Sequence, residues 1–317
     1  MPTTPTLVFV PGAWHKPSCY DKVIAILQES YGLKCTAITL PSTLDNPSAT
    51  FKDDLDVARE AISTEINEGR DVVLIAHSYG GMVANSAIKG FARPSNTVTS
   101  EATPSTGHVI GLILIASGFT LTGMAFMDPF LGYPPPAWRV NKTTGYAEIV
   151  VNPRQFFYHD VPTEEAEYRV SQLTTQSLKS LFEGAEHAYA GWRDVPAWYI
   201  GTIEDQGLPV VAQRINVGFA REMGTHVEHR ELQTSHSPFL SRPKETASLL
   251  REAVEAFAGV AIQTATEAVI PAGIVLPSPR LWQPSSWFRY GLPLVFGRLF
   301  GRGYLVFSWV RGCFARK

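Results

Sequence analysis

The stretch VVLIAHSYGGM, residues 72–82, decides how the rest of the chain is interpreted. A buried apolar run leads into a turn centred on Ser78 and passes directly into a helical pattern that begins at Gly80. A serine in such a sharp strand-to-helix turn is held above the edge of a sheet with its hydroxyl exposed. The two backbones lie close there, and Ala76 and Gly80 supply the small residues that the turn needs. The stretch therefore predicts a nucleophilic serine, against the alternative of an ordinary turn with an incidental serine.

Apolar runs and helical patterns alternate on both sides of this turn. The strands are expected at 7–10, 37–40, 71–76, 109–117, 197–200 and 227–232, and the helices at 20–27, 51–66, 80–91, 210–223 and 244–257. Buried strands without polar alternation, separated by helices, are typical of a parallel sheet covered on both faces. The sequence therefore predicts an α/β protein with a mostly parallel, doubly wound sheet.

Residues 119–195 interrupt the alternation. They are rich in aromatic residues, contain three consecutive prolines at 134–136, and include one clear helix that begins at Thr163. An insertion at this point would form a helical lid over the carboxyl edge of the sheet, where such folds bind ligands. Its aromatic side chains would either line an apolar pocket or pack the lid onto the body. Residues 92–107, rich in Pro, Ser and Thr, predict an exposed loop.

A serine hydroxyl is a weak nucleophile until a base takes its proton. His236 is the best placed of the eight histidines, because it follows the strand at 227–232 and so lies at the same sheet edge as Ser78. An acid must then orient the imidazole. The strand at 197–200 leads to both Glu204 and Asp205, and we prefer Asp205. We expect His77, which precedes the serine, to orient or pack rather than to act as the base.

The loop after the first strand, Pro11-Gly12-Ala13, is the candidate for an oxyanion site. Gly12 lets the backbone turn close to the serine, which leaves the Ala13 amide as a donor beside the amide of Tyr79. A phosphate-binding loop is the other interpretation of this glycine. Neither G-x-G-x-x-G nor G-x-x-x-x-G-K-[ST] is present, which argues against it.

Together PGAWH (11–15), AHSYGG (76–81), IED (203–205) and SHSPFLSRP (235–243) resemble the small α/β hydrolases. This group includes plant methylesterases, hydroxynitrile lyases and many microbial and fungal members, and the resemblance covers residues 6–257. It implies the α/β-hydrolase fold and a serine esterase mechanism. In that mechanism Ser78 attacks, His236 carries the proton, Asp205 supports it, and the amides of Ala13 and Tyr79 hold the oxyanion.

Two departures from the motifs of this family limit the reactions that we expect the chain to catalyse. Hydroxynitrile lyases have lysine after the catalytic histidine and threonine in place of the first-loop glycine. Ser237 and Gly12 in this chain therefore argue against cyanohydrin cleavage. A proline-glycine first loop also occurs in cofactor-free dioxygenases of this fold, and C–C bond hydrolases share the triad, so both stay as alternatives. A non-catalytic receptor that keeps the pocket is a third.

The composition of the chain limits the classes of molecule that it is expected to bind. The chain has 317 residues, 45% of them hydrophobic and 18% charged, and a net charge of −2, so no global field recruits nucleic acid. Three scattered cysteines predict neither a disulfide framework nor a metal site, and no cofactor is expected.

No leader segment is visible at the N-terminus, so we expect a cytoplasmic location. The expected substrate is an uncharged ester or lactone of a small apolar or aromatic metabolite, from specialised metabolism.

Residues 260–317 form an extension after a catalytic domain at 1–259. From Ala268 onward the extension has no acidic residue but six arginines and one lysine. Arg298 and Arg302 interrupt an apolar stretch four residues apart, so a helix would place both on one side. Arginine with interfacial tryptophan is typical of a helix that lies on a membrane surface. Docking on the catalytic body, a homodimer contact and a poorly ordered tail are the alternatives.

Overall fold

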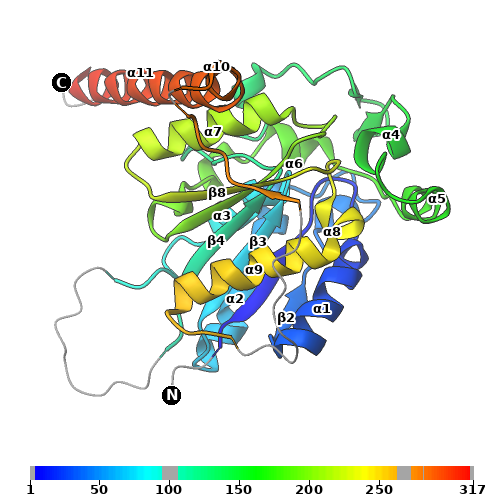
Figure 1. The fold of residues 1–317 in the computed structure, drawn as a ribbon. Coiled ribbons are helices and arrows are strands. Elements are labelled where there is room, and N and C mark those ends of the chain that lie inside the picture. Colours follow the sequence, from blue (N-terminus) through cyan, green and yellow to red (C-terminus); the bar gives the residue numbers. More distant parts are fainter. Residues whose placement is uncertain (1–3, 95–105, 263–272, 281, 315–317) are drawn as a thin grey trace.

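The computed structural model describes residues 4–94, 106–262, 273–280 and 282–314, and its centre is a seven-stranded sheet (Figure 1). From one edge to the other its strands are β2 (Cys35–Ala37), β1 (Thr6–Val10), β3 (Val72–His77), β4 (Val109–Ile115), β7 (Ala197–Thr202), β8 (Val227–Leu232) and β9 (Ile274–Val275). Neighbouring strands pair in parallel except β8 and β9, which are antiparallel. The mostly parallel α/β sheet that the sequence predicts is confirmed.

Helices cover both faces of the sheet. In Figure 1, α1 (Asp21–Tyr31) and α9 (Pro243–Ala258) lie in front of the strands, and α2 (Phe51–Asn67) and α3 (Gly80–Ala87) lie behind them. Helix α7 (Val210–Glu222) packs on β7 and β8, and the short α8 (Pro238–Ser241) precedes α9. Single 3-10 turns occur at Pro17–Tyr20, Pro41–Thr43, Asp128–Phe130, Ala185–His187 and Gly191–Arg193.

Local signals explain where helices begin and which side they bury. In α2, Thr50 and Asp53 form a capping box: the Thr50 hydroxyl accepts from the Asp53 amide, and the Asp53 carboxylate accepts from the Thr50 amide at 2.7 Å. Leu55, Ala58 and Ile62 then face the core at helical spacing. The helix begins at Phe51 as predicted.

Three predicted boundaries were wrong by three or four residues. Helix α1 continues to Tyr31 instead of ending at residue 27. The second strand pairs over Cys35–Ala37 rather than over 37–40. Ile38 and Leu40 are buried because the chain turns into the core after the pairing ends, so apolar character there does not mark a strand. Helix α3 ends at Ala87, four residues before the predicted end. The predicted loop at 92–107 falls largely outside the described residues.

The insertion between β4 and β7 has more regular structure than expected. It contains the hairpin β5 (Trp138–Asn141) and β6 (Tyr146–Ile149), and the helices α4 (Pro153–Phe157), α5 (Thr163–Ser171) and α6 (Leu178–Phe182). Only α5 was predicted. Trp192, Phe157 and Tyr158 are fully buried, so these aromatic side chains pack the insertion onto the body.

The C-terminal extension folds back on the domain. After β9 come α10 (Pro284–Ser286), a π-helical turn at Trp287–Gly291 and the long helix α11 (Leu292–Phe314). Figure 1 shows α11 running alongside α7 at the top of the molecule. Among the described residues, none of the helices is both long enough and apolar enough to cross a membrane.

A buried carboxylate joins the amino ends of the central strands. Glu65 accepts hydrogen bonds from Thr6 of β1 at 2.6 Å, from Lys34 before β2 at 2.8 Å and from Arg70 before β3 at 2.5 Å. Burial alone would raise the pKa of Glu65, but the bonds from Arg70, Lys34 and Thr6 outweigh it and lower the pKa to about 2. The ionised form is therefore favoured by folding.

We expect Glu65→Gln to lower the free energy of unfolding at pH 7 by about 2 kcal/mol. Because the folded pKa is depressed, this contribution is complete above the usual glutamate pKa and is lost as the pH falls toward about 2. The stability difference between wild type and variant should accordingly shrink below about pH 4.5. Urea unfolding of both proteins at several pH values measures it; a difference that is constant with pH would contradict this account.

Candidate active site

Ser78 occupies the sharp turn between β3 and α3 in a strained backbone conformation. Its φ is +51°, a left-handed value that non-glycine residues rarely adopt. The turn is fixed from the neighbouring strand: the Ser78 amide donates to Ile115 O at 3.1 Å, and the Ser117 hydroxyl donates to Ser78 O at 2.6 Å. A Cβ on Gly80 would lie 2.4 Å from Pro11 O, so only glycine fits there. The strain and the small residue are what a raised, exposed serine requires.

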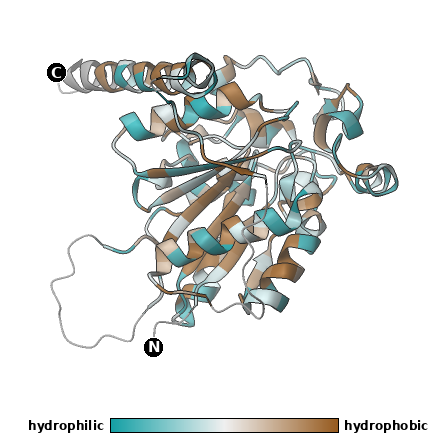
Figure 2. Cartoon of the chain, viewed as in Figure 1, coloured by the Kyte–Doolittle hydropathy of each residue, from teal (hydrophilic) through white to brown (hydrophobic). Residues whose placement is uncertain are grey.

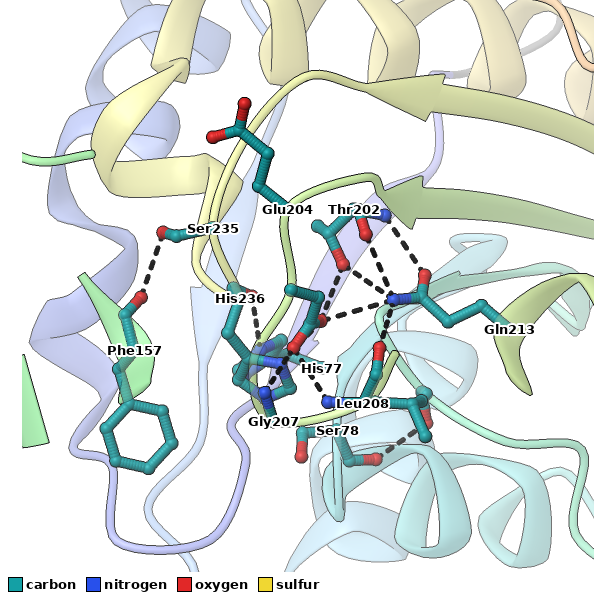
Figure 3. A network of polar contacts seen from close by, with 12 residues as sticks. His77, Ser78, Phe157, Thr202, Glu204, Gly207, Leu208, Gln213, Ser235 and His236 are labelled. Atoms are coloured by element: carbon teal, nitrogen blue, oxygen red, sulfur yellow. Dashed lines mark hydrogen bonds and ion pairs between the residues drawn. The ribbon is translucent and has the colours of Figure 1, made fainter. Parts of the chain in front are cut away.

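His236 lies in the loop between β8 and α8, at the same edge of the sheet as Ser78 (Figure 3). Its Nδ1 is 2.7 Å from Asp205 Oδ2. Its backbone carbonyl accepts a hydrogen bond at 3.0 Å from Nε2 of His77, the residue before Ser78. Within the described residues the Ser78 hydroxyl makes no hydrogen bond to the His236 ring; such bonds are often long without substrate and tighten in the complex.

The loop after β7 contains two adjacent carboxylates, Glu204 and Asp205, which point in different directions. Asp205 is buried; its Oδ1 accepts from the amides of Gly207 and Leu208, both at 2.7 Å, and its Oδ2 accepts from Thr202 Oγ1 at 2.6 Å. Glu204 is exposed, and its carboxylate bonds Gln233. The structure therefore brings Asp205, and not Glu204, to the imidazole of His236.

Two backbone amides next to Ser78, in buried residues, have no hydrogen-bond acceptor among the described residues. Within the described residues, neither the Ala13 nor the Tyr79 amide donates a hydrogen bond, although both residues are buried. A Cβ on Gly12 would lie 3.0 Å from Ser78 Cβ, so this glycine lets the first loop approach the serine. The Tyr79 side chain is anchored by a 2.7 Å bond to Asp54, whose pKa burial raises to about 6. Buried donors left free are available to a ligand oxygen.

A serine at a strained strand-to-helix turn, with a histidine and an aspartate from later strands at the same edge, has the geometry of one fold family. A model of the alpha/beta hydrolase family matches residues 7–249. The chain belongs to this family. It is a hydrolase of the α/β-hydrolase fold.

Relatives span most of this hydrolase and nearly the whole of their own length. Alpha/beta hydrolase nvfD of Aspergillus novofumigatus is 26% identical over 265 residues, which cover 82% of this chain and 98% of the relative. Methylesterase 7 of Arabidopsis thaliana is 26% identical over 262 residues, 79% of this chain and 96% of the relative. Among solved structures, a pyrethroid hydrolase from Sphingobium faniae JZ-2 has a TM-score of 0.61 at 18% identity, covering 81% of this chain and all of that one. Polyneuridine aldehyde esterase has a TM-score of 0.61 at 21% identity, covering 79% and 99%.

Two further histidines of the hydrolase, His77 and His15, lie beside the site. His77 and His15 are buried, and burial, aided by the nearby His236, lowers the pKa of His77 well below its usual value. Burial likewise lowers the pKa of His15 to about 4. Both rings are therefore neutral at physiological pH. A neutral His77 must donate from Nε2 to the His236 carbonyl, which makes it an orienting group, as we expected from the sequence.

Two residues of the insertion form hydrogen bonds to the loops that contain Asp205 and His236. The sequence did not predict these contacts. Asp160 Oδ2 accepts from the Ser235 amide at 3.0 Å and from Thr234 Oγ1 at 2.9 Å, immediately before His236. His159 Nε2 donates to Glu204 O at 2.9 Å, immediately before Asp205. We call these contacts the insertion clamp. The partners are 45 to 75 residues apart in the chain, so no local pattern reveals them.

The described residues of the hydrolase contain no group of three or more His, Cys, Asp and Glu side chains placed to hold a metal ion. Of the two histidines near β8, His229 is buried against Glu231, with 3.4 Å between its Nε2 and Oε1 of the carboxylate.

Proposed function

We propose that this hydrolase is a serine esterase that cleaves an uncharged carboxylic ester or lactone of a small apolar or aromatic metabolite through an acyl-enzyme. The observation that carries the proposal is the bond of 2.7 Å between His236 and the buried Asp205, at the sheet edge that also holds the strained Ser78. The names of relatives and neighbours agree with it, since they include a methylesterase, polyneuridine aldehyde esterase and a pyrethroid hydrolase.

The proposed mechanism follows from which atoms carry protons. Asp205 accepts from Nδ1–H of His236, so Nε2 has the lone pair that can take the Ser78 proton. The serine oxygen attacks the ester carbonyl, and the free amides of Ala13 and Tyr79 stabilise the oxyanion. His236 then gives the proton to the leaving alcohol, and water hydrolyses the acyl-enzyme by the reverse order of proton transfers.

The side chains around the base favour an apolar substrate. The rings of Phe157 and Phe156 lie 5.8 Å and 6.4 Å from the ring of His236, measured between centroids. Both come from α4 of the insertion, which in this proposal acts as the lid. Both phenylalanines are buried, so their rings give the imidazole an apolar surrounding in which a charged substrate group would have to lose its hydration.

A fluorophosphonate probe tests the proposal directly, because it reacts covalently with a serine that has an activating base. We expect one probe molecule per chain, attached to the peptide that contains Ser78, and blocked when a phenyl ester competes. Peptide mass spectrometry locates the adduct. A folded protein that stays unlabelled, or that is labelled at another serine, would remove the serine esterase from consideration.

A further inference from the structure

We propose that the outward face of α11 is a docking surface for anionic lipid headgroups and the acyl chains beneath them. This inference concerns the extension beyond the family match, which ends at residue 249, and it does not depend on the proposed esterase activity. It rests on three features of the described residues: how α11 packs on α7, what its opposite face exposes, and which charges lie beside that face.

One side of α11 is fixed against the catalytic domain by close backbone contact. A Cβ on Gly297 would lie 2.1 Å from Ile215 O of α7, and a Cβ on Gly218 of α7 would lie 2.3 Å from Leu294 O. Arg302 Nε is 2.6 Å from Glu222 Oε1, and Arg214 donates to Arg289 O at 2.8 Å. Since this side packs on α7, only the opposite side of α11 can contact a partner. The helix axis must then lie parallel to the partner's surface.

The opposite side is apolar over four turns. Its side chains follow helical spacing, interrupted only at Gly303, and are 40% to 64% exposed: Leu292, Val295, Phe296, Leu299, Phe300, Val306 and Phe307. At about 1.5 Å per residue this stripe is about 22 Å long. Figure 2 shows the brown, apolar segments of α11 at the outer edge of the molecule. We call these seven residues the outer stripe; so long a contiguous apolar face on a helix indicates a partner.

The charges beside the outer stripe select the partner. From Ala268 to the C-terminus the chain carries six arginines, one lysine and no acid. On the described part of α11, Arg302 pairs with Glu222 of α7, whereas Arg298 is exposed and makes no ion pair there. A second copy would bring the same patch against itself across a two-fold axis and set arginine against arginine, with no acid in the extension to neutralise them. Lipid phosphates supply that negative charge, while the acyl region receives the outer stripe.

Vesicle flotation with the full chain tests this surface. The probes are vesicles of phosphatidylcholine alone and of phosphatidylcholine with about 30 mol% phosphatidylserine. We expect the wild type to float with the anionic vesicles, and less at high salt. The triple variant Phe296→Ser/Leu299→Ser/Phe300→Ser should bind at least about tenfold less, and Arg298→Gln about fivefold less.

The matched control is Leu44→Ser/Leu131→Ser/Tyr168→Ser, which removes three exposed hydrophobic side chains elsewhere on the surface. It should float like the wild type. Both triple variants should keep the wild-type melting temperature, because their side chains point to solvent. The inference is overturned if the wild type floats with neither vesicle, or if the control loses as much binding as the α11 variant. It is also overturned if the wild type fails to float and is a dimer that the α11 substitutions turn into a monomer, since that assigns the outer stripe to a second copy.

Discussion

Replacing Ser78 with alanine is expected to lower kcat/KM for aryl esters by about 10⁴- to 10⁶-fold. The variant keeps the amides of Ala13 and Tyr79 and the His236–Asp205 pair, so a small residual rate above that in water should remain. The strained φ of +51° is no harder for alanine than for serine, and the fold should be unchanged. Steady-state kinetics with a p-nitrophenyl ester series measure the loss.

The chain offers a matched control for this variant in Ser237, the residue after His236. Its hydroxyl is buried without a hydrogen-bond partner in the described structure, so Ser237→Ala should leave both activity and stability close to wild type. Ester hydrolysis that survives Ser78→Ala within about tenfold would mean that another group attacks the carbonyl, and the acyl-enzyme route would have to be abandoned.

Replacing Asp205 with asparagine should lower kcat by about 10⁴-fold, with a smaller change in KM. An asparagine at this position can turn its NH₂ group toward His236 and so favour the tautomer that protonates Nε2. The ring then has no lone pair facing Ser78 and cannot take the proton. The variant should also react more slowly with the fluorophosphonate probe, which separates loss of the base from loss of substrate binding.

Glu204→Gln serves as the control for Asp205→Asn, because the two carboxylates are adjacent and only Asp205 reaches the imidazole. We expect its rate to stay within about twofold of wild type. Equal losses in the two variants would show that the measured effect comes from disturbing the loop. A loss confined to Glu204→Gln would transfer the role of the acid to that residue.

The parts of the site that the sequence predicts are those fixed by local geometry. Ser78 is recognisable because a strand, a tight turn and a helix follow one another within eleven residues, and Gly80 is small because Pro11 O leaves no room for a Cβ. Asp205 and His236 follow from the parallel sheet, since the carboxyl ends of β7 and β8 must lie at one edge. Chain order and strand ends were sufficient to place these three residues at that edge.

What the sequence does not predict depends on contacts between distant segments. The role of Asp160 depends on the Ser235 amide, 75 residues away, and nothing near Asp160 marks it. The packing of α11 on α7 depends on the close contact between Gly218 and Gly297 of the two helices. Neither glycine alone predicts that contact. Similarly, β2 is a short edge strand whose residues are only partly buried, so its apolar signal is weaker than that of the buried turn that follows.

The insertion clamp has a consequence for changing the specificity of this enzyme. Exchanging residues 153–161 for the corresponding stretch of a relative would alter the rings of Phe156 and Phe157 beside His236, but would also remove the carboxylate that fixes Ser235 and the imidazole that fixes Glu204 O. Substrate preference and turnover would then change together. A chimera that keeps Asp160 and His159 while varying the phenylalanines would let the two properties be engineered one at a time.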